Sequence, residues 1–284
     1  MKVIPKKIRL GALLLMAAFL TFLLPAKSTP EPEISPLFLE LAETESDPLL
    51  QELIIPGIKA PSEEETDSAL GGEQKYAYLT FDDGPSRNTS QILDILDKYG
   101  VKGVFFVMGH SINGRNDSQQ LLGRMLDEGH YIGLHSMSHQ AQTLYYDDRG
   151  PANFLEEMSA LQQIVNELTG GFMSRLYRAP YGTVGTFTDA HVDAMTASPL
   201  HAWDWNVDSC DWKAETVEEL LENIRFDLHH RQHSPHAVIL FHETDLTIEA
   251  LPLVIEYLIA EGFEIKAYKP SKHFPINFLD HPDL

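Results

Sequence analysis

A regular alternation of short apolar runs and amphipathic segments begins at residue 75 and restricts the fold more than any other feature. The apolar runs have the length and composition of buried strands. The segments between them repeat apolar residues with helical periodicity, and several end at a glycine such as Gly100 or Gly129. We expect strands at residues 75–81, 104–108, 131–134, 176–178, 201–206, 237–241 and 263–267, and helices at residues 89–99, 118–128, 153–168, 188–195, 216–229 and 246–260.

This order of elements indicates consecutive βα units and a parallel sheet. The expected fold class is therefore α/β, and about seven units predict a distorted, incomplete (β/α)7-8 barrel of parallel strands. An open, doubly wound sheet shows the same alternation, so the pattern alone leaves that alternative open.

Two segments of different composition precede the alternating region. Residues 1–28 place Lys2, Lys6, Lys7 and Arg9 before the uncharged run 10–24, which is short for a membrane span and typical of a signal peptide. We expect a signal peptide or an N-terminal membrane anchor, with the rest of the protein secreted or in the cell envelope, outside the cytoplasm. Residues 29–73 are rich in proline and acidic residues and are expected to form a linker. The main domain is expected at 74–270, with a C-terminal tail at 271–284.

The charge balance excludes one large class of partners. The chain has 21 Lys and Arg against 42 Asp and Glu, a formal net charge of −21. Nucleic acid is not an expected partner, because Lys and Arg carry phosphate binding. Membrane association is expected through the N-terminal segment only. The single cysteine, Cys210, excludes an intrachain disulfide and a cysteine-rich zinc site.

Polar clusters follow the expected strands at the points where the strands end. They are residues 80–85, 135–139, 178–182, 208–212 and 242–243. The carboxyl ends of parallel strands meet at one edge of the sheet, where α/β enzymes place their active sites. We therefore expect these clusters to form one site.

Two histidines and a pair of aspartates in these clusters suggest a catalytic metal site. His135 and His139 are four residues apart, so both imidazoles can reach one metal from a single helical turn. With a carboxylate from Asp82 or Asp83 they form a His₂-carboxylate set with an open position. Successive side chains in extended backbone point in opposite directions, so the two aspartates can divide the roles of metal ligand and base. The pattern does not say which aspartate takes which role.

The five clusters resemble, in order, the motifs of the polysaccharide deacetylase family, also called the NodB-homology domain or carbohydrate esterase family 4. The resemblance covers residues 75–268 and includes the specific patterns TFDDGP and HSxxH. It implies that the main domain is catalytic, that Asp82 is the general base and that Asp83, His135 and His139 hold a divalent metal. It also implies that Arg178 positions the base.

The same resemblance assigns the remaining site residues. It implies that the backbone N–H of Tyr181 helps to form the oxyanion hole and that Trp212 and Leu240 line the pocket for the acetyl group. His242 is then the general acid, and Asp211 tunes that histidine. Independently of the resemblance, Tyr145 and Tyr146 in the long loop after His139 are candidates for stacking on a sugar ring, whereas Trp203 and Trp205 are expected in the core.

The expected function is that of an exported, metal-dependent deacetylase. Its substrates would be N-acetylated cell-wall or extracellular glycans, peptidoglycan or chitin-like oligomers, and its metal Zn²⁺, with Co²⁺ or Ni²⁺ as alternatives. One alternative function is an O-acetyl esterase on xylan-like polysaccharide, because the same attack by water cleaves esters. The other is a catalytically silent carbohydrate-binding module, which would need neither base nor acid.

Overall fold

The computed structural model describes residues 74–230 and 234–284. The expected signal peptide or anchor at 1–28 and the expected linker at 29–73 lie outside the described residues. None of the described helices is both long and apolar enough to cross a bilayer. The described residues belong to one compact unit that ends at Leu284.

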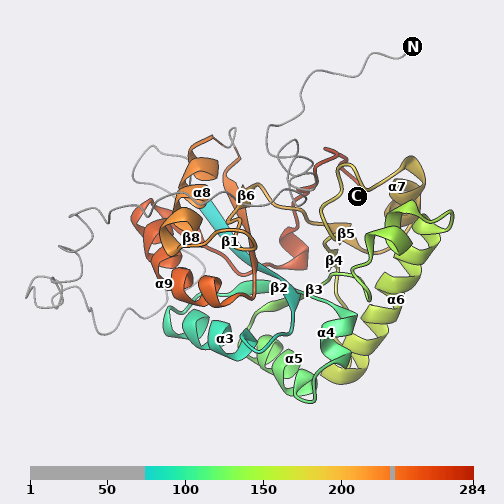
Figure 1. Ribbon diagram of the computed structural model, residues 1–284, viewed down its shortest axis with the longest axis horizontal. Helices are drawn as coiled ribbons and strands as arrows, with labels where there is room; N and C mark the ends of the chain where they lie inside the picture. Colours follow the sequence, from blue (N-terminus) through green and yellow to red (C-terminus); the bar gives the residue numbers. More distant parts are fainter. Residues whose placement is uncertain (1–73, 231–233) are drawn as a thin grey trace, which may run out of the picture. The chain divides into compact units, whose positions relative to one another are not determined.

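Parallel pairing joins all the strands of the described region into one curled sheet (Figure 1). The strand order is β5-β4-β3-β2-β1-β7-β6, and β8 pairs with the first residues of β1. The strands are β1 (Lys75–Gly84), β2 (Gly103–Val107), β3 (Tyr131–Leu134), β4 (Leu176–Tyr177), β5 (His201–Ala202), β6 (Val207–Asp208), β7 (His236–His242) and β8 (Phe263–Ile265). This arrangement confirms the expected incomplete (β/α) barrel.

The barrel has a seam between β5 and β6, where the prediction of one continuous strand at 201–206 is wrong. The chain pairs with β4 up to Ala202 and with β7 from Val207 onward. Between them, Trp203 forms a bridge to Ile276, and the N–H of Asn206 donates to the carbonyl of Val238. The strand is interrupted because these residues cross from one edge of the sheet to the other.

Helices follow the strands and pack on the outside of the curled sheet (Figure 1). They are α3 (Thr89–Lys98), α4 (Gly109–Asn113), α5 (Ser118–Asp127), α6 (Gly150–Thr169), α7 (Asp189–Thr196), α8 (Val217–His230) and α9 (Asp245–Ala260), with a π-helical turn at Gln142–Tyr146 and a 3₁₀ turn at Pro270–Lys272. The longer helices confirm the helices expected from periodicity. The short α4 and the π-helical turn were not expected, because a single turn is too short to show a period.

Alternation along β1 divides the core into two clusters. Ala77, Leu79 and Phe81 point outward and join the cluster that the helices cover. Tyr78 points inward and joins Phe106 and Trp203 in a smaller cluster inside the barrel. Asp82 continues the inward-facing row and lies directly opposite His242 on β7. The alternation that builds the core therefore also turns polar side chains toward the mouth of the barrel.

The segment expected as a C-terminal tail packs against this barrel. The indole N–H of Trp203 donates to the carbonyl of Phe274 at 3.2 Å. The N–H of Asp204 donates to the carbonyl of Ile276 at 2.8 Å, and the last residue, Leu284, is buried in the outer cluster. Residues 271–284 thus add backbone pairing at the seam.

The outer cluster predicts a large effect for one core truncation. Phe105 is fully buried, and its ring lies 5.0 Å from that of Phe81. We expect Phe105→Ala to lower the free energy of unfolding by about 3–5 kcal/mol, because it removes buried area and leaves a cavity. Urea titration measures the loss. The control Phe226→Ala removes a ring that is 58% exposed and should change stability by under about 0.5 kcal/mol. Equal effects of the two variants would contradict the packing described.

Candidate active site

The polar clusters meet at the carboxyl ends of the strands, as expected. Asp82 and Asp83 lie at the end of β1, and His242 ends β7. His135 directly follows β3, and Arg178 directly follows β4. Parallel pairing of β3, β2, β1 and β7 brings these ends to one rim.

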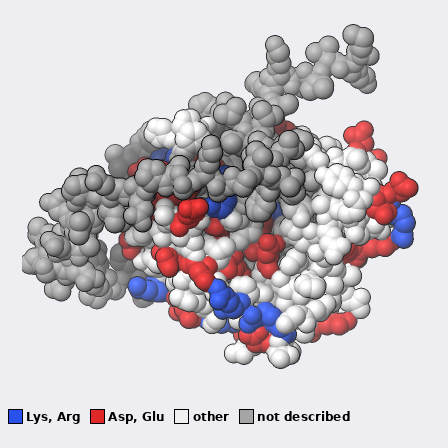
Figure 2. Space-filling view, in the orientation of Figure 1, with Lys and Arg blue, Asp and Glu red and all other residues white. Residues whose placement is uncertain are grey.

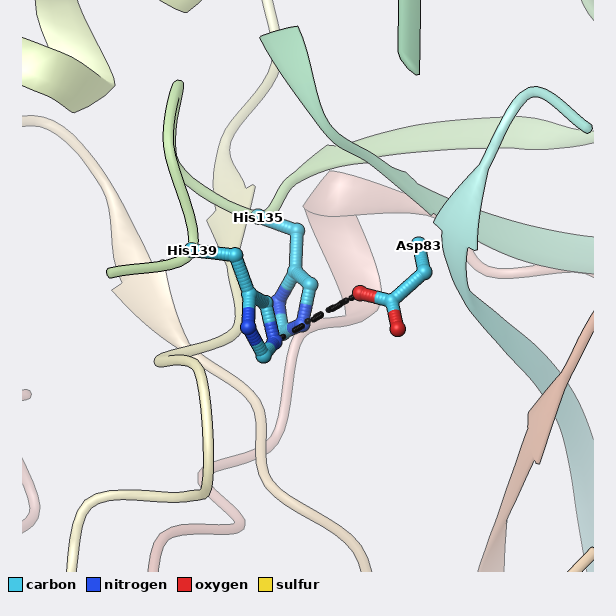
Figure 3. Close-up of side chains that lie close together, drawn as sticks. All are labelled: Asp83, His135 and His139. Carbon is cyan, nitrogen blue, oxygen red and sulfur yellow. Dashed lines mark ion pairs between the residues drawn. The ribbon is translucent and has the colours of Figure 1, made fainter. Parts of the chain in front are cut away.

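A candidate metal site is formed by Asp83, His135 and His139, whose ligand atoms all lie within 4.8 Å of one another (Figure 3). Asp83 Oδ1 is 3.5 Å from the Nε2 atom of each histidine. This oxygen is buried and has no hydrogen-bond partner among the described residues. Nδ1 of His135 donates to the carbonyl of Arg178 at 2.8 Å, which leaves its Nε2 lone pair facing the site. An orphaned carboxylate oxygen and oriented imidazoles are the donors that a divalent cation requires, so these residues fit a metal.

The charge state of His139 also suits a ligand. Burial lowers the pKa of His139, and the neighbouring His135 lowers it further, against the opposing charges of Asp83 and Asp82. A neutral imidazole is the form that binds metals.

The backbone of the site differs from the expected geometry in two places. Ser136 and His139 have positive φ angles, so the two histidines lie on a tight turn and the expectation of one helical turn is wrong. Asp83 also has a positive φ, at an irregularity in the pairing of β1 with β2. As a result both aspartate side chains approach His135, with Asp82 Oδ2 at 3.8 Å from its Nε2. The expectation that the neighbouring carboxylates point in opposite directions is wrong, because it assumed extended backbone at Asp83.

Glu157 holds the turn between the two histidines from helix α6. Its Oε2 accepts hydrogen bonds from the backbone N–H groups of Met137 and Ser138, at 3.0 and 2.9 Å. The hydroxyl of Ser138 donates to Oε1 of the same carboxylate at 2.8 Å. Sequence reasoning missed this residue, because nothing in the pattern of an amphipathic helix marks one glutamate as turned toward a distant loop.

A buried ion pair joins Asp82 to Arg178. Nη1 of Arg178 donates to Asp82 Oδ1 and to Thr80 Oγ1, both at 2.8 Å. Nε and Nη2 donate to the backbone carbonyls of Trp203 and Asp204. Burial lowers the pKa of Arg178, the charge of Asp82 opposes that effect, and the guanidinium stays charged. Oδ1 of Asp82 is thereby engaged, and Oδ2 faces the metal site.

A second ion pair, His242 with Asp211, lies across the site. Nδ1 of His242 donates to Asp211 Oδ1 at 2.8 Å, and its backbone N–H donates to Oδ2 at 2.6 Å. Thr247 also donates to Oδ2, which fixes the carboxylate. Burial alone would lower the pKa of His242, but the hydrogen bond and charge of Asp211, helped by Asp82 and Asp83, raise it to about 9. His242 is therefore an imidazolium at neutral pH.

Three predicted binding residues surround these pairs. Tyr181 has a positive φ and is 45% exposed; its ring lies 4.7 Å from that of His139, and its hydroxyl donates to the His139 carbonyl. Trp212 is 47% exposed beside Asp211. Leu240 is buried on β7, on the same face of the strand as His242.

The other aromatic candidates separate into core and surface. Tyr145 is buried, and its hydroxyl donates to the carbonyl of Pro180, so its assignment as a sugar platform is wrong. Tyr146 is 65% exposed and stays a candidate. Trp203 is fully buried, which confirms the prediction that it lies in the core. Trp205 is partly buried and packs against the inner cluster.

The position of Glu243 explains why a glycine, Gly84, occurs in the polar cluster at residues 80–85. Its buried carboxylate accepts hydrogen bonds from the N–H of Ser86 and the hydroxyl of Thr89. A Cβ atom at Gly84 would lie 2.2 Å from Oε1 of Glu243. A side chain at residue 84 would therefore displace this carboxylate from its place under the turn that carries the aspartates.

Comparisons with known proteins agree with this geometry. Residues 70–203 match the family model described as polysaccharide deacetylase. The chain is 32% identical over 211 residues to a peptidoglycan-N-acetylglucosamine deacetylase of Bacillus cereus, covering 73% of this chain and 74% of that protein. It is 30% identical to the peptidoglycan-N-acetylmuramic acid deacetylase PdaA of Bacillus subtilis, covering 69% and 70%.

A solved structure also has the same fold. The polysaccharide deacetylase Bc1974 of Bacillus cereus superposes with a TM-score of 0.66 at 30% identity, over 74% of this chain and all of that one. Family membership implies a hydrolase that acts on N-acetyl amide bonds. With the motifs assembled at one rim of an incomplete barrel, the chain belongs to the polysaccharide deacetylase family, carbohydrate esterase family 4.

Proposed function

We propose that this protein is an exported, metal-dependent deacetylase that hydrolyses N-acetyl groups of cell-wall or extracellular glycans. Peptidoglycan is the first candidate substrate and chitin-like oligomers are the second. The observation that carries the proposal is the pair of opposed charged groups beside the candidate metal site. Asp82, bound to Arg178, and His242, bound to Asp211, face the same rim, and the raised pKa of His242 suits an acid.

The metal is the first element of the proposed chemistry. Asp83, His135 and His139 would hold it and leave a position open, which is typical of a catalytic rather than a structural site. A bound divalent cation, Zn²⁺ in our proposal and Co²⁺ or Ni²⁺ as alternatives, would lower the pKa of water and polarise the acetyl carbonyl.

Asp82 is proposed as the general base. Its Oδ1 is engaged by Arg178, so Oδ2 is the atom that accepts a proton from the attacking water. Arg178 also prevents the carboxylate from rotating, because the guanidinium is itself held by backbone carbonyls. The hydroxide equivalent would add to the acetyl carbon, and we propose that the backbone N–H of Tyr181 stabilises the oxyanion that forms.

His242 is proposed as the general acid. It donates a proton to the glycan nitrogen as the C–N bond breaks, so that acetate and a free amine leave. An amine leaves only when protonated, whereas an alcohol from an ester needs this help less. A histidine that is charged at neutral pH therefore favours N-deacetylation over the alternative, O-acetyl esterase activity on xylan-like polysaccharide. Trp212 and Leu240 would enclose the acetyl methyl group.

The proposed substrate and location support each other. The relatives described above are named for peptidoglycan deacetylation, and that polymer lies outside the cytoplasm. A signal peptide or anchor at residues 1–28 would bring the protein there, and membrane association would go through that segment only. Acidic side chains are spread over the face seen in Figure 2, which disfavours nucleic acid as a partner.

Mass spectrometry of acetylated glycans tests the function directly. We expect loss of acetyl groups from peptidoglycan fragments and N-acetylglucosamine oligomers, but not from acetylated xylan.

Removal of metal should lower the rate at least ~100-fold, and added Zn²⁺ should restore it. Asp82→Asn should lower turnover ~10²–10⁴-fold while it keeps the metal. The exposed Asp97→Asn serves as the control. Activity that survives thorough metal removal would contradict the mechanism, and bound metal without any turnover would indicate a silent binding module.

Asp211→Asn should change the pH dependence of turnover. The acid must be protonated, so wild-type kcat/KM should fall as the pH rises through about 9. Without the carboxylate charge, burial dominates and the pKa of His242 falls. The alkaline limb should then move to lower pH by about one unit or more. A pH–rate profile from pH 6 to 10 measures it; an unmoved limb would show that His242 is not the acid, or that Asp211 does not tune it.

Glu157→Gln should weaken metal binding. The amide keeps the shape of the side chain but cannot accept both backbone N–H groups with a charged oxygen, so the turn that carries His139 loosens. Groups that orient metal ligands typically contribute ~10–100-fold to affinity. Competition with a zinc indicator measures the change. Glu156→Gln alters the adjacent, exposed glutamate and should leave affinity unchanged; equal affinities for both variants would remove Glu157 from the site.

A further inference from the structure

Asp204 has an unusual position for a charged residue. Its side chain is fully buried at the seam of the barrel, directly behind Arg178. Burial raises the pKa of Asp204, while the donors from Thr183 and Phe278 and the charge of Arg178 oppose that rise. A buried carboxylate is unfavourable unless hydrogen bonds and a counter-charge compensate it, so the local structure must be organised around this group.

The carboxylate joins two segments that are far apart in the chain. The hydroxyl of Thr183 donates to Asp204 Oδ2 at 2.5 Å. The backbone N–H of Phe278 donates to the same oxygen at 2.9 Å and lies 3.2 Å from the Thr183 hydroxyl. The backbone N–H of Asp204 in turn donates to the carbonyl of Ile276. Asp204 therefore connects residues 276–278 to the loop that begins at Arg178.

The same C-terminal segment covers the far side of that loop. The ring of Phe278 lies 4.8 Å from that of Trp205. A Cβ atom at Gly182 would come within 2.7 Å of the Phe278 ring and 3.3 Å of Trp205. Gly182 and Tyr181 both have positive φ angles. This backbone conformation is unfavourable for a residue with a side chain, so neighbouring contacts must stabilise it at Tyr181.

We propose that Asp204 is a positioning residue and that it acts with Thr183 and Phe278 to hold the Tyr181 backbone N–H in place. This inference rests on the proposed function, in which that N–H stabilises the oxyanion. The loop at residues 178–183, which carries Tyr181, is held at its start by Arg178 and at its end by Thr183. Both anchors converge on Asp204, through its backbone carbonyl and its side chain. The C-terminal segment thus helps to position this loop.

The test compares substitutions at Thr183. Thr183→Val keeps the shape and removes the hydroxyl, whereas Thr183→Ser keeps the hydroxyl. We expect Thr183→Val to lower kcat about tenfold or more, with KM within about twofold and metal content unchanged, because a misplaced donor weakens only the transition state. Thr183→Ser should restore kcat to within about threefold of wild type. Thr196→Val, in α7, is the matched control and should have wild-type kinetics.

A second readout is independent of turnover. Amide hydrogen exchange in residues 179–184 should be about tenfold faster in Thr183→Val and in Phe278→Ala than in wild type. Wild-type kcat and exchange in either folded variant would overturn the positioning role. A wild-type protein that is inactive on every acetylated glycan would instead refute the proposed function, and the exchange measurement would still decide the role of Asp204.

Discussion

The buried ion pair between Arg178 and Asp82 is the interaction on which the rest of the site depends. Two charges inside a barrel are unfavourable unless each donor and acceptor has a partner. Here the guanidinium donates to one carboxylate, one hydroxyl and two backbone carbonyls, and its face lies 4.2 Å from the centroid of the Phe106 ring. The arginine thereby connects β1 to β4 and to the seam. The same hydrogen bonds compensate the burial of Asp82 and orient its carboxylate, which is the proposed general base.

Strained backbone surrounds this pair and is held by side chains from elsewhere in the fold. Asp83, Ser136, His139, Tyr181 and Cys210 all have positive φ angles and all lie in the polar clusters. Such residues are typically unfavourable by about 1–3 kcal/mol each, so other contacts must compensate. Two carboxylates from other parts of the fold supply such contacts. Glu157 holds the turn between the histidines, and Glu243 lies beneath the turn of the aspartates.

Electrostatics divides the rim into regions of different function. On one side His135 and His139 face the Asp83 oxygen that has no hydrogen-bond partner among the described residues, a set of donors that fits a cation. On the other side His242 keeps its proton, because Asp211 favours the charged imidazole. Histidines in one site thus have opposite pKa shifts, lowered at His139 and raised at His242. This difference in pKa suits the roles proposed for them, a neutral metal ligand and a protonated acid.

The sequence by itself determined the order of strands and helices and the types of group at the rim. Both are local properties. Apolar residues that repeat every two or every 3.6 residues show which face of a strand or helix is buried. The patterns TFDDGP and HSxxH each place their polar side chains within a few residues of one another. Tertiary structure alone decided the direction of Asp83, the burial of Tyr145, the break at residues 203–206 and the contacts of Glu157, Asp204 and Phe278. These depend on partners far along the chain and on positive φ angles at ordinary residues. Neither the local repeat of apolar residues nor the type of a residue predicts such contacts, because they form only when the sheet curls into a barrel and distant segments meet.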